Sequence, residues 1–493
     1  MMEKSARRKR MNLLKAQAKG FWDVYKQNKK GLFGLGLIAF FLVFAYFGPM
    51  LSDNDPVHDW DVGGRRVPPS WFRRLPGYEH LVPNLYPVEE SGFYDASEFE
   101  VWDIDASSSI SLSYSDDGFP DGSGPGSMKI TQGNGGEVET ITVSKTFNWD
   151  YDNPPKRFTG EFGFKAEDLE DSTIDLSLVL VDTDDNRYVL WEREVRSDTE
   201  WEQPEYKVDS YSIRVKMLFP EGVLADPAQK IFSKSGEYEF KLVAAFDGKG
   251  SGSPVLLIDD LNIELMGTCF GLLGTDQWGR DVYSQLAHGA KISLFVGLMS
   301  AIISVTIGLV VGLFAGFMGG IVDEVSMRFA DMLLVIPSLP LLLVLIAILG
   351  QSITNIIIVI SLLGWMGFSR TVRSQVLSLK ERAFIEAARA AGGSTVHITL
   401  KHILPNVMGL VYVSLATNVP GAITAEASLS FLGLGDPNIM SWGQMLHDIV
   451  FYAAIKELYW VVPPGLCIAL LAVSFVMIGF SLDEILNPRL RGR

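Results

Sequence analysis

The stretch EAARAAGGSTVHITLKHILPN, residues 386–406, is small and polar, although the chain on either side of it is strongly apolar. Alanine, glutamate and arginine are strong helix formers, so they predict a short helix up to Ala390. The glycine pair that begins at Gly392 ends this helix and removes side-chain bulk. VHITLKHIL then predicts a second short helix, and Pro405 suits the start of the next apolar run. These residues predict a compact helical connector, and an ordinary loop between two spans is the alternative that they leave open.

Long apolar runs flank this connector, and a membrane-spanning helix requires about 20 such residues. One run alone is explained equally well by a buried helix, but six in one chain indicate a polytopic membrane protein. The first run is too long for a signal-peptide core and is followed by no small-residue cleavage site, so we expect an uncleaved span. The fourth run is short, and the fifth contains Pro420 and Glu426, so we expect it to break near its end. The six predicted spans are 32–51, 292–318, 332–350, 354–369, 407–430 and 459–482.

Basic residues predict the orientation of these spans, because they concentrate on the cytoplasmic side of membrane proteins. Residues 1–31 carry ten Lys and Arg, residues 370–401 carry six, and the tail 484–493 adds three arginines. With six spans, all three segments lie on one side of the membrane. We therefore expect both termini and the connector in the cytoplasm, and the long segment 52–273 outside the cell membrane.

The segment 52–273 differs from the rest of the chain in charge and in pattern. It holds 43 acidic and 19 basic residues, a net charge of −24, whereas the rest of the chain has a net charge of +8. Between residues 97 and 266, short runs alternate apolar and polar residues, with Gly, Asp and Asn between them, which is typical of strands. They predict an all-β sandwich of the jelly-roll kind. The predicted strands include TIDLSLVLVD (173–182), YVLWEREV (188–195), SIRVKMLF (212–219), EYEFKLVAAF (237–246) and PVLLIDDLNIEL (254–265).

Candidate sites for metals and cofactors are few. DTDDNR, residues 182–187, clusters the oxygen ligands that calcium prefers, but it lacks the glycine and glutamate of an EF-hand loop. A hairpin turn between two strands is the simpler interpretation. The two cysteines, Cys269 and Cys467, show no metal-ligand spacing, and the phosphate-binding pattern GxxxxGK[ST] is absent. We expect no catalytic residue, no metal, no cofactor and no nucleic-acid partner in this chain.

Several of these stretches resemble the permease subunits of ABC importers. EAARAAGG…KHILPN resembles the coupling-loop signature of that family. LLGTDQWGRDVYSQLAHGAKISLFVGL (272–298), MRFADMLLVIPSLPLLLVLIAILG (327–350) and AEASLSFLGLGDPNIMSWGQML (425–446) resemble the C-type permease of dipeptide, oligopeptide and nickel importers. In that family a short loop joins a PPSW-like element to LGTD. Here PPSW ends at Trp71 and LLGTD begins at Leu272, so the resemblance implies a large insertion. The end of that insertion, LLIDDLNIEL, resembles the closing strand of jelly-roll modules of the carbohydrate-binding type.

The resemblance implies a type I ABC importer fold in the inner (cytoplasmic) membrane. The expected partners are a second permease subunit, two subunits that bind ATP and magnesium, and an external substrate-binding protein. The coupling loop would dock into a cleft of the ATP-binding subunit, with a charged contact from Glu386 and close packing by Ala387, Ala388 and Gly392. The expected domains are a cytoplasmic segment 1–31, a first span 32–51, an insertion 52–273 with its sandwich core at 97–266, a five-helix permease domain 290–483 with the coupling loop 377–405, and a cytoplasmic tail 484–493.

Glu426 is the carboxylate predicted deepest in the apolar runs, near the outer end of the fifth. A charge there is costly unless it faces water or a partner, so we expect a role in the pore or in an outer gate. The alternative is a carboxylate that caps backbone amides in the turn that follows.

The substrate and the class of protein each have alternatives. Peptides or similar small solutes are the expected cargo, and oligosaccharides or, with less support, nickel are the alternatives within the family. A membrane-anchored receptor or adhesin is the alternative from another class, but it has no use for a dock for an ATPase. A membrane hydrolase needs a nucleophile and a base in the insertion, whose histidines are confined to His58 and His80.

Overall fold

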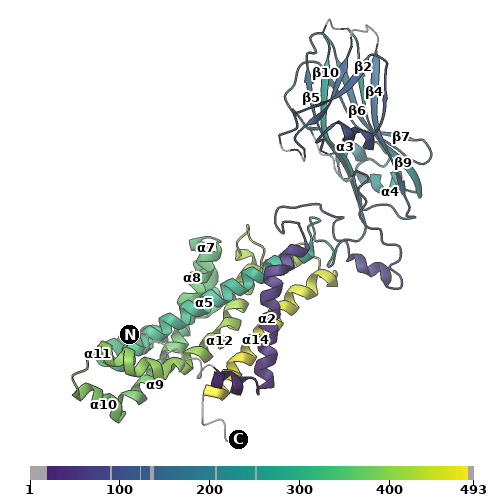
Figure 1. Cartoon of the computed structure of the whole chain (residues 1–493). Coiled ribbons are helices and arrows are strands. Elements are labelled where there is room, and N and C mark those ends of the chain that lie inside the picture. The colour runs from purple at the N-terminus through teal and green to yellow at the C-terminus, as the bar shows by residue number, and fades with distance from the viewer. Residues whose placement is uncertain are drawn as a thin grey trace, which may run out of the picture. The chain divides into compact units, whose positions relative to one another are not determined.

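The structure is a computed structural model of the 493-residue chain, and it describes residues 19–88, 92–120, 122, 124–133, 138–205, 208–249 and 252–486. The chain divides into two compact units: Met1–Asp59 with Val282–Arg493, and Trp60–Asp281. We call them the helical unit and the sandwich unit and describe each by itself (Figure 1). Most of the basic N-terminal segment and the three arginines of the tail lie outside the described residues.

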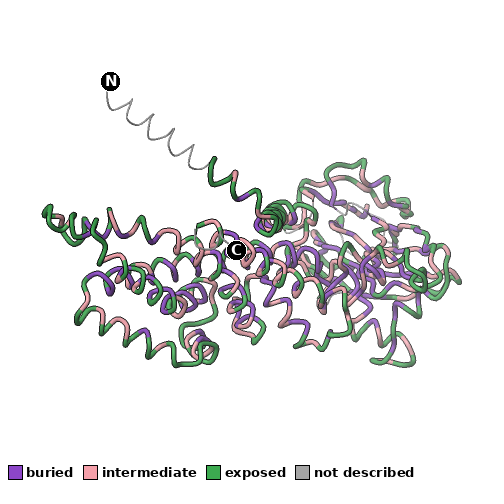
Figure 2. The backbone as a smooth tube through the Cα atoms, turned by 90° about the horizontal axis from the view of Figure 1, so that it is seen from below, coloured by how far each residue is buried: buried purple, intermediate pink, exposed green. Residues whose placement is uncertain are grey.

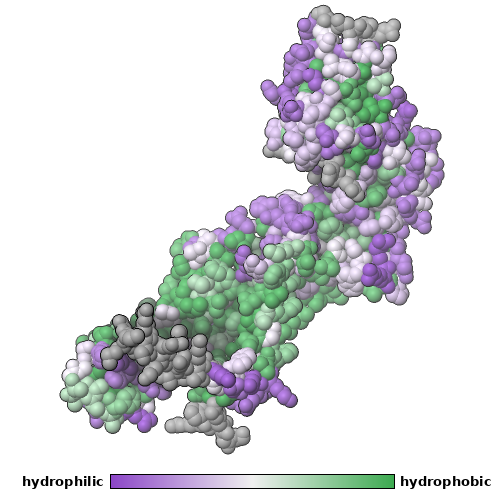
Figure 3. Space-filling model, viewed as in Figure 1, coloured by the Kyte–Doolittle hydropathy of each residue, from purple (hydrophilic) through white to green (hydrophobic). Residues whose placement is uncertain are grey.

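The helical unit consists of long apolar helices joined by short amphipathic ones. Five stretches of described residues are long and apolar enough to cross a membrane: Lys29–Leu51, Val282–Met318, Ile353–Lys380, Thr395–Leu434 and Leu458–Leu486. The surface of this unit is mainly hydrophobic in Figure 3. Its helices are α2 (Lys29–Phe47), α5 (Val282–Met318), α6 (Gly320–Val335), α7 (Ser338–Leu349), α8 (Ile353–Gly364), α9 (Met366–Lys380), α10 (Ala383–Ala390), α11 (Thr395–Ile398), α12 (Leu404–Leu429), α13 (Trp442–Phe451) and α14 (Leu458–Leu486).

The predicted third span, 332–350, is wrong as a single straight helix. The chain bends by 93° between α6 and α7, so these two helices make a sixth span only as a bent pair. Ile336 is extended, with φ −74° and ψ 128°, because it precedes Pro337 and the proline ring disfavours a helical conformation there. The short fourth run, by contrast, continues through α8 and α9 over 28 residues.

Glycines allow the helices of this unit to pack closely. Gly308, Gly312 and Gly316 recur every four residues along α5 and therefore share one face. A Cβ added at Gly308 would lie 2.7 Å from the carbonyl oxygen of Trp365. A Cβ added at Gly312 would lie 2.5 Å from the carbonyl oxygen of Ser369. Small residues at this spacing let helix backbones approach each other in membranes. These three glycines therefore let α5 pack closely against α9, the helix that leads to the connector.

The sandwich unit contains two five-stranded sheets in which all neighbouring strands are antiparallel. Their orders are β1-β4-β9-β6-β7 and β2-β3-β10-β5-β8. Buried residues concentrate inside this unit, and exposed residues lie on its outer loops (Figure 2). The strands are β1 (Asp103–Ala106), β2 (Ile110–Ser115), β3 (Ser127–Gln132), β4 (Glu139–Trp149), β5 (Arg157–Glu167), β6 (Ile174–Val181), β7 (Arg187–Val195), β8 (Val208–Asp209), β9 (Gly236–Phe246) and β10 (Val255–Met266).

Four of the five strands predicted by alternation are confirmed, as β6, β7, β9 and β10. The fifth, 212–219, is wrong, because residues Ile213–Lys216 form the short helix α3. The Asp209 carboxylate accepts hydrogen bonds from the backbone N–H groups of Tyr211 and Ser212, and this turns the chain away from the sheet. Among the apolar side chains of residues 212–219, Val215 alone is fully buried in the core. The alternation of apolar and polar residues in this stretch therefore does not reflect a strand with one buried face.

The two ends of the insertion lie side by side. The backbone N–H of Phe270 donates to the carbonyl of Pro68 at 2.9 Å, and that of Ser70 donates to Gly271 at 3.0 Å. The indole N–H of Trp71 donates to the carbonyl of Leu272 at 2.9 Å. The PPSW and LLGTD elements are therefore adjacent in space although about 200 residues separate them in the sequence.

Candidate functional site

The connector forms two short helices separated by a glycine turn, as the sequence predicts. α10 ends at Ala390, and Gly392 adopts φ +81°, a conformation that favours glycine. Ser394 caps α11 by accepting a hydrogen bond from the backbone N–H of His397. The second helix is shorter than predicted, because a π-helical turn at Thr399–Ile403 carries the chain into α12 without a break.

Apolar side chains fasten the connector to the long helices. Ile385 of α10, Ile398 of α11 and Ile403 are buried in one cluster with Val372 and Val376 of α9. Burial of one such side chain contributes about 1.5–3 kcal/mol. The connector is therefore a firmly packed element of the helical unit and not a loose loop.

The predicted coupling residues fall into two groups. Glu386, Ala387 and Gly392 are exposed, and nothing lies within 4 Å of a Cβ added at Gly392. Ala388 is half-buried and packs against the cluster that holds the connector, so much of its small side chain faces inward. The structure thus leaves two small residues and one carboxylate free on the outer side of the connector.

Sequence reasoning missed three large side chains on the same connector. Phe384 is 44% exposed, Val396 is 60% exposed and Leu400 is 56% exposed. Exposed apolar groups rimmed by charged residues are typical of protein interaction surfaces. The signal in the sequence was present: large apolar residues stand in a stretch that is otherwise small and polar. Together with Glu386 and Ala387, they form what we call the connector surface.

Ion pairs tie α6 to the helix that leads into the connector. A guanidinium N–H of Arg373, on α9, donates to a carboxylate oxygen of Asp323 at 2.6 Å, and Arg370 pairs with Asp331. Both acidic residues belong to α6. The two ion pairs therefore join α6 to α9, the helix that leads into the connector.

Glu426 lies inside the protein and not on an open surface. Its side chain is 3% exposed, and one carboxylate oxygen accepts hydrogen bonds from the hydroxyls of Ser430 at 2.8 Å and Ser441 at 2.7 Å. These donors are side-chain hydroxyls, so the alternative of a cap on backbone amides does not describe them. The contact fastens the segment before α13 to the end of α12. A role in a pore or outer gate stays a prediction.

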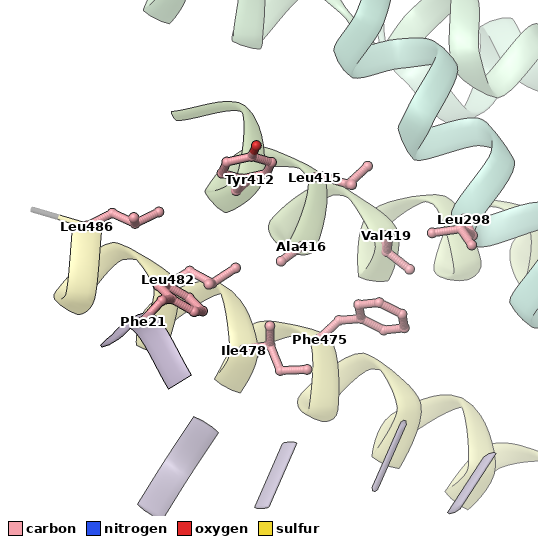
Figure 4. A pocket seen from close by; sticks show the side chains of 10 residues that line it. All are labelled: Phe21, Leu298, Tyr412, Leu415, Ala416, Val419, Phe475, Ile478, Leu482 and Leu486. Carbon is pink, nitrogen blue, oxygen red and sulfur yellow. The ribbon is translucent and has the colours of Figure 1, made fainter. Parts of the chain in front are cut away.

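The helical unit also has an apolar groove of about 500 Å³. Its lining side chains come from α5, α12 and α14, together with Phe21 (Figure 4). None of the lining residues is charged, and Tyr412 carries the hydroxyl among them. The groove suits hydrocarbon and offers few hydrogen bonds to a peptide, so it is no candidate for a peptide site. The lining residues are Phe21, Leu298, Tyr412, Leu415, Ala416, Val419, Phe475, Ile478, Leu482 and Leu486.

The acidic DTDDNR stretch is the turn between β6 and β7. Asp182 accepts hydrogen bonds from the backbone of Asp184, from Asn186 and from the Tyr188 hydroxyl. Burial alone would raise the pKa of Asp182, but these hydrogen bonds hold that pKa below its usual value. Among the residues that the structure describes, no group of three His, Cys, Asp or Glu side chains is placed to hold a metal ion. The hydrogen bonds to Asp182 are those of a turn between two strands, in agreement with the simpler interpretation.

Comparison with known proteins places the helical unit in a family. Residues 308–492 match the family described as binding-protein-dependent transport system inner membrane component, and residues 17–69 match the N-terminal transmembrane domain of oligopeptide transport permease C. The dipeptide permease DppC of Bacillus subtilis is 38% identical over 219 residues, which cover 44% of this chain and 68% of that protein. The oligopeptide permease OppC of Escherichia coli K12 is 43% identical over 217 residues, which cover 44% of this chain and 72% of that protein.

Solved structures are more distant. An inward-facing MetNI methionine ABC transporter is 20% identical and covers 42% of this chain and 97% of its own, with a TM-score of 0.34. The carbohydrate-binding module TmCBM61, solved with β-1,4-galactotriose, is 14% identical and covers 36% of this chain and 97% of its own, with a TM-score of 0.22. Neither score is high enough to assign a function. The sequence matches suffice for the family: the chain belongs to the binding-protein-dependent transport permeases of the inner membrane, as a C-type subunit related to the oligopeptide and dipeptide permeases.

Proposed function

We propose that this chain forms half of the translocation pathway of an ATP-driven importer for peptides or similar small solutes. The connector surface carries the proposal, because a firmly packed helix pair with small and apolar residues on its outer side suits docking of another subunit. The permeases that match the chain are named for dipeptides, oligopeptides and glutathione, which supports peptides as the cargo. ATP and magnesium would be held by the ATP-binding subunits.

The assembled transporter would contain a second permease, two ATP-binding subunits and an external binding protein that delivers the substrate. Glu386 would make a charged contact with the ATP-binding subunit, and Ala387 and Gly392 would allow close approach. Closure of the ATP-binding pair would move the connector, and α6 and α9 would follow through their ion pairs. Glu426 would keep the end of α12 and the segment before α13 moving as one piece at the pore.

Transport by the reconstituted complex tests this function. With ATP and magnesium inside proteoliposomes and the binding protein outside, we expect the rate of uptake of labelled short peptides to exceed that of the ATP-free control by at least about tenfold. An excess of unlabelled oligosaccharide or nickel should leave peptide uptake unchanged. Uptake of an oligosaccharide in place of peptides would reassign the substrate.

We also propose that the sandwich unit lies outside the cell membrane and that the connector and both termini lie in the cytoplasm. The observation in favour is the concentration of basic residues in residues 1–31 and 370–401, set against the acidic insertion. Asp185 is an exposed residue of the β6–β7 turn, and Lys26 is exposed before the first span.

Thiol labelling in intact cells tests this orientation. An impermeant reagent should label the variant Asp185→Cys and should leave Lys26→Cys unlabelled until the membrane is opened. The unsubstituted chain is the blank for its two native cysteines. Labelling of Lys26→Cys in intact cells would invert the orientation and remove the connector from the side where ATP is hydrolysed.

A further inference from the structure

The segment between β8 and β9 exposes an unusual number of apolar side chains. Leu224 is 91% exposed, Ile213 is 63% exposed and Met217 is 60% exposed, and Leu218 and Val223 are exposed as well. The segment is nevertheless anchored, because Val215 is fully buried in the sandwich core. Large exposed apolar patches mark interaction sites in soluble domains. The exposed apolar side chains between β8 and β9 therefore indicate a surface that contacts another molecule.

The segment lies at one end of the sandwich, which we call the base. Asp209 of β8 pairs with Thr159 near the start of β5, and the backbone N–H of Ser210 donates to the carbonyl of Phe158. Met266, the last residue of β10, pairs with Arg157 at the same end. The chain runs from β10 to α5, and the linker from α2 reaches this end through its contacts with residues 267–276. Both chain connections to the membrane-spanning helices therefore leave from the base.

A second group of exposed side chains lies at the base, around the short helix η2 (Ser70–Arg74). Trp71 and Leu272, which are joined by a hydrogen bond, are 47% and 54% exposed, and Leu75 and Tyr78 are exposed too. The guanidinium of Arg73 stacks 5.8 Å from the ring centre of Tyr151, which follows β4. This contact holds η2 against the β4–β5 loop, which belongs to the base.

Most of the exposed large apolar side chains of the sandwich unit, among its described residues, belong to these two groups. We call them together the base surface: Trp71, Leu75, Tyr78, Ile213, Met217, Leu218, Val223, Leu224 and Leu272. An ordinary soluble surface would spread such residues singly.

Basic residues also concentrate in the segments that carry the base surface. The insertion has a net charge of −24, yet residues 62–78 contain four arginines and no acidic residue. Residues 210–220 contain Arg214 and Lys216 and no acidic residue. Basic groups beside exposed Leu, Met, Trp and Tyr are the composition of surfaces that lie in the headgroup region of a bilayer. These two stretches are therefore basic within a domain of net charge −24, and Asp61, Asp209, Glu221 and Asp226 lie beside them.

We propose that the base surface contacts lipid, with Leu224, Met217 and Trp71 in the interfacial layer and the basic side chains on anionic headgroups. The choice of the outer leaflet rests on the proposed function, which puts the sandwich unit outside. Removal of apolar side chains from water is favourable, so partial insertion of several of them restricts the tilt of the sandwich unit. A domain held in this way keeps a restricted tilt relative to the bilayer.

Lipid contact can be measured on the full chain in nanodiscs that contain phosphatidylglycerol. A bimane probe is attached at Leu224→Cys, and the matched control is Val138→Cys, whose parent residue is also apolar and is 70% exposed. Val138 precedes Glu139, which pairs with Phe246, whereas Trp149 pairs with Gly236 at the other end of β4. Eleven residues of strand separate the two ends, about 35 Å. The unsubstituted chain corrects for any labelling of the two native cysteines, of which Cys269 is buried and Cys467 is half-buried.

Spin-labelled lipid should quench the probe at 224 at least about twofold and should leave the probe at 138 unchanged. The charge-reversal pair Arg214→Glu and Lys216→Glu should reduce the quenching at 224. Equal quenching at both positions, or none at 224, would overturn the proposal. So would a probe at 224 that becomes shielded from iodide in detergent when the binding protein or another subunit is added, because the occupant would then be a protein. The measurement requires neither transport nor a given orientation, since both leaflets carry the spin label, so its failure is separate from failure of the proposed function.

Discussion

The variant Ala387→Trp should lose most of its substrate-stimulated ATP hydrolysis in the assembled transporter while the chain itself stays folded. Ala387 is exposed on α10, whereas the buried Ile385 holds that helix in place, so an indole at position 387 disturbs no contact of the described chain. If the connector surface sits in a cleft of the ATP-binding subunit, the added bulk cannot be accommodated. Overpacking typically costs about 1–3 kcal/mol, which corresponds to roughly a 5- to 150-fold loss of productive docking. The measurement is ATPase activity of the reconstituted complex with and without the loaded binding protein.

The matched control is Ile321→Trp, which adds the same ring at a residue of α6 that is 80% exposed and lies outside the connector. The control should keep its stimulation. Glu386→Lys separates charge from bulk, because it reverses the carboxylate without adding a ring. We avoid Ala388 because a larger side chain there would disturb the buried cluster of the connector. Normal stimulation and uptake by Ala387→Trp would show that this loop does not transmit the closure of the ATP-binding pair.

The connector is the part that the sequence predicted best, because its signals are local. Alanine-rich helix formers, a glycine at φ +81° and a serine cap act within a few residues, and each adopts the conformation that its chemistry favours. The exposed Phe384, Val396 and Leu400 were missed because their exposure depends on which side of each short helix packs against α9 and α12. The inward side of each helix carries Ile385 or Ile398, whose buried cluster includes side chains of α5 that are distant in the sequence.

The errors arose where a local pattern fits two structures. The apolar run 332–350 is long enough for a span, and one proline decides that its first residues belong to a different helix. The alternation in 212–219 suits a strand, but Asp209 turns the chain and leaves Ile213 and Met217 exposed. The proline bend does not change the mean hydropathy of 332–350, and the turn does not change the apolar–polar period of 212–219. Hydropathy and period alone therefore could not distinguish one span from two helices, or a strand from a short helix.

The final prediction concerns a buried ion cluster at the base of the sandwich unit. Arg157 is 2% exposed and lies between the carboxylates of Asp61 and Asp209, and it stacks 5.2 Å from the ring centre of Tyr211. Asp61 belongs to the linker from the first span, and Asp209 starts the turn that leads to the base surface. Arg65 pairs with Asp61 as well. One guanidinium thus joins the linker, the sheet and the turn.

Replacing this group in Arg157→Leu should lower the free energy of unfolding of the sandwich unit by about 3–5 kcal/mol. Asp209 then stays largely buried without a cation, and Asp61 keeps only its pair with Arg65. Denaturant unfolding of the purified chain, followed by its total tryptophan fluorescence, to which the buried Trp149 and Trp191 of the sandwich unit contribute, measures the change. Arg196→Leu is the matched control. That arginine pairs with Glu194 on the surface and is 74% exposed, so its loss should leave the transition unchanged.

The pH dependence distinguishes this electrostatic effect from a simple loss of packing. Burial would raise the pKa of Asp61, but hydrogen bonds and charge from Arg157 and Arg65 hold that pKa below its usual value of 3.8. A carboxyl with a lowered folded pKa stabilises the protein above its unfolded pKa, and this stability is lost as the pH falls through the folded value. Without Arg157 the same carboxyl gains a proton more readily in the folded state. The difference in stability between the parent chain and Arg157→Leu should therefore narrow as the pH falls from 7 to below 4. If the difference in unfolding free energy stays constant over this range, the loss of stability comes from lost packing around the guanidinium. The charges of the cluster would then contribute little to the stability of the sandwich unit.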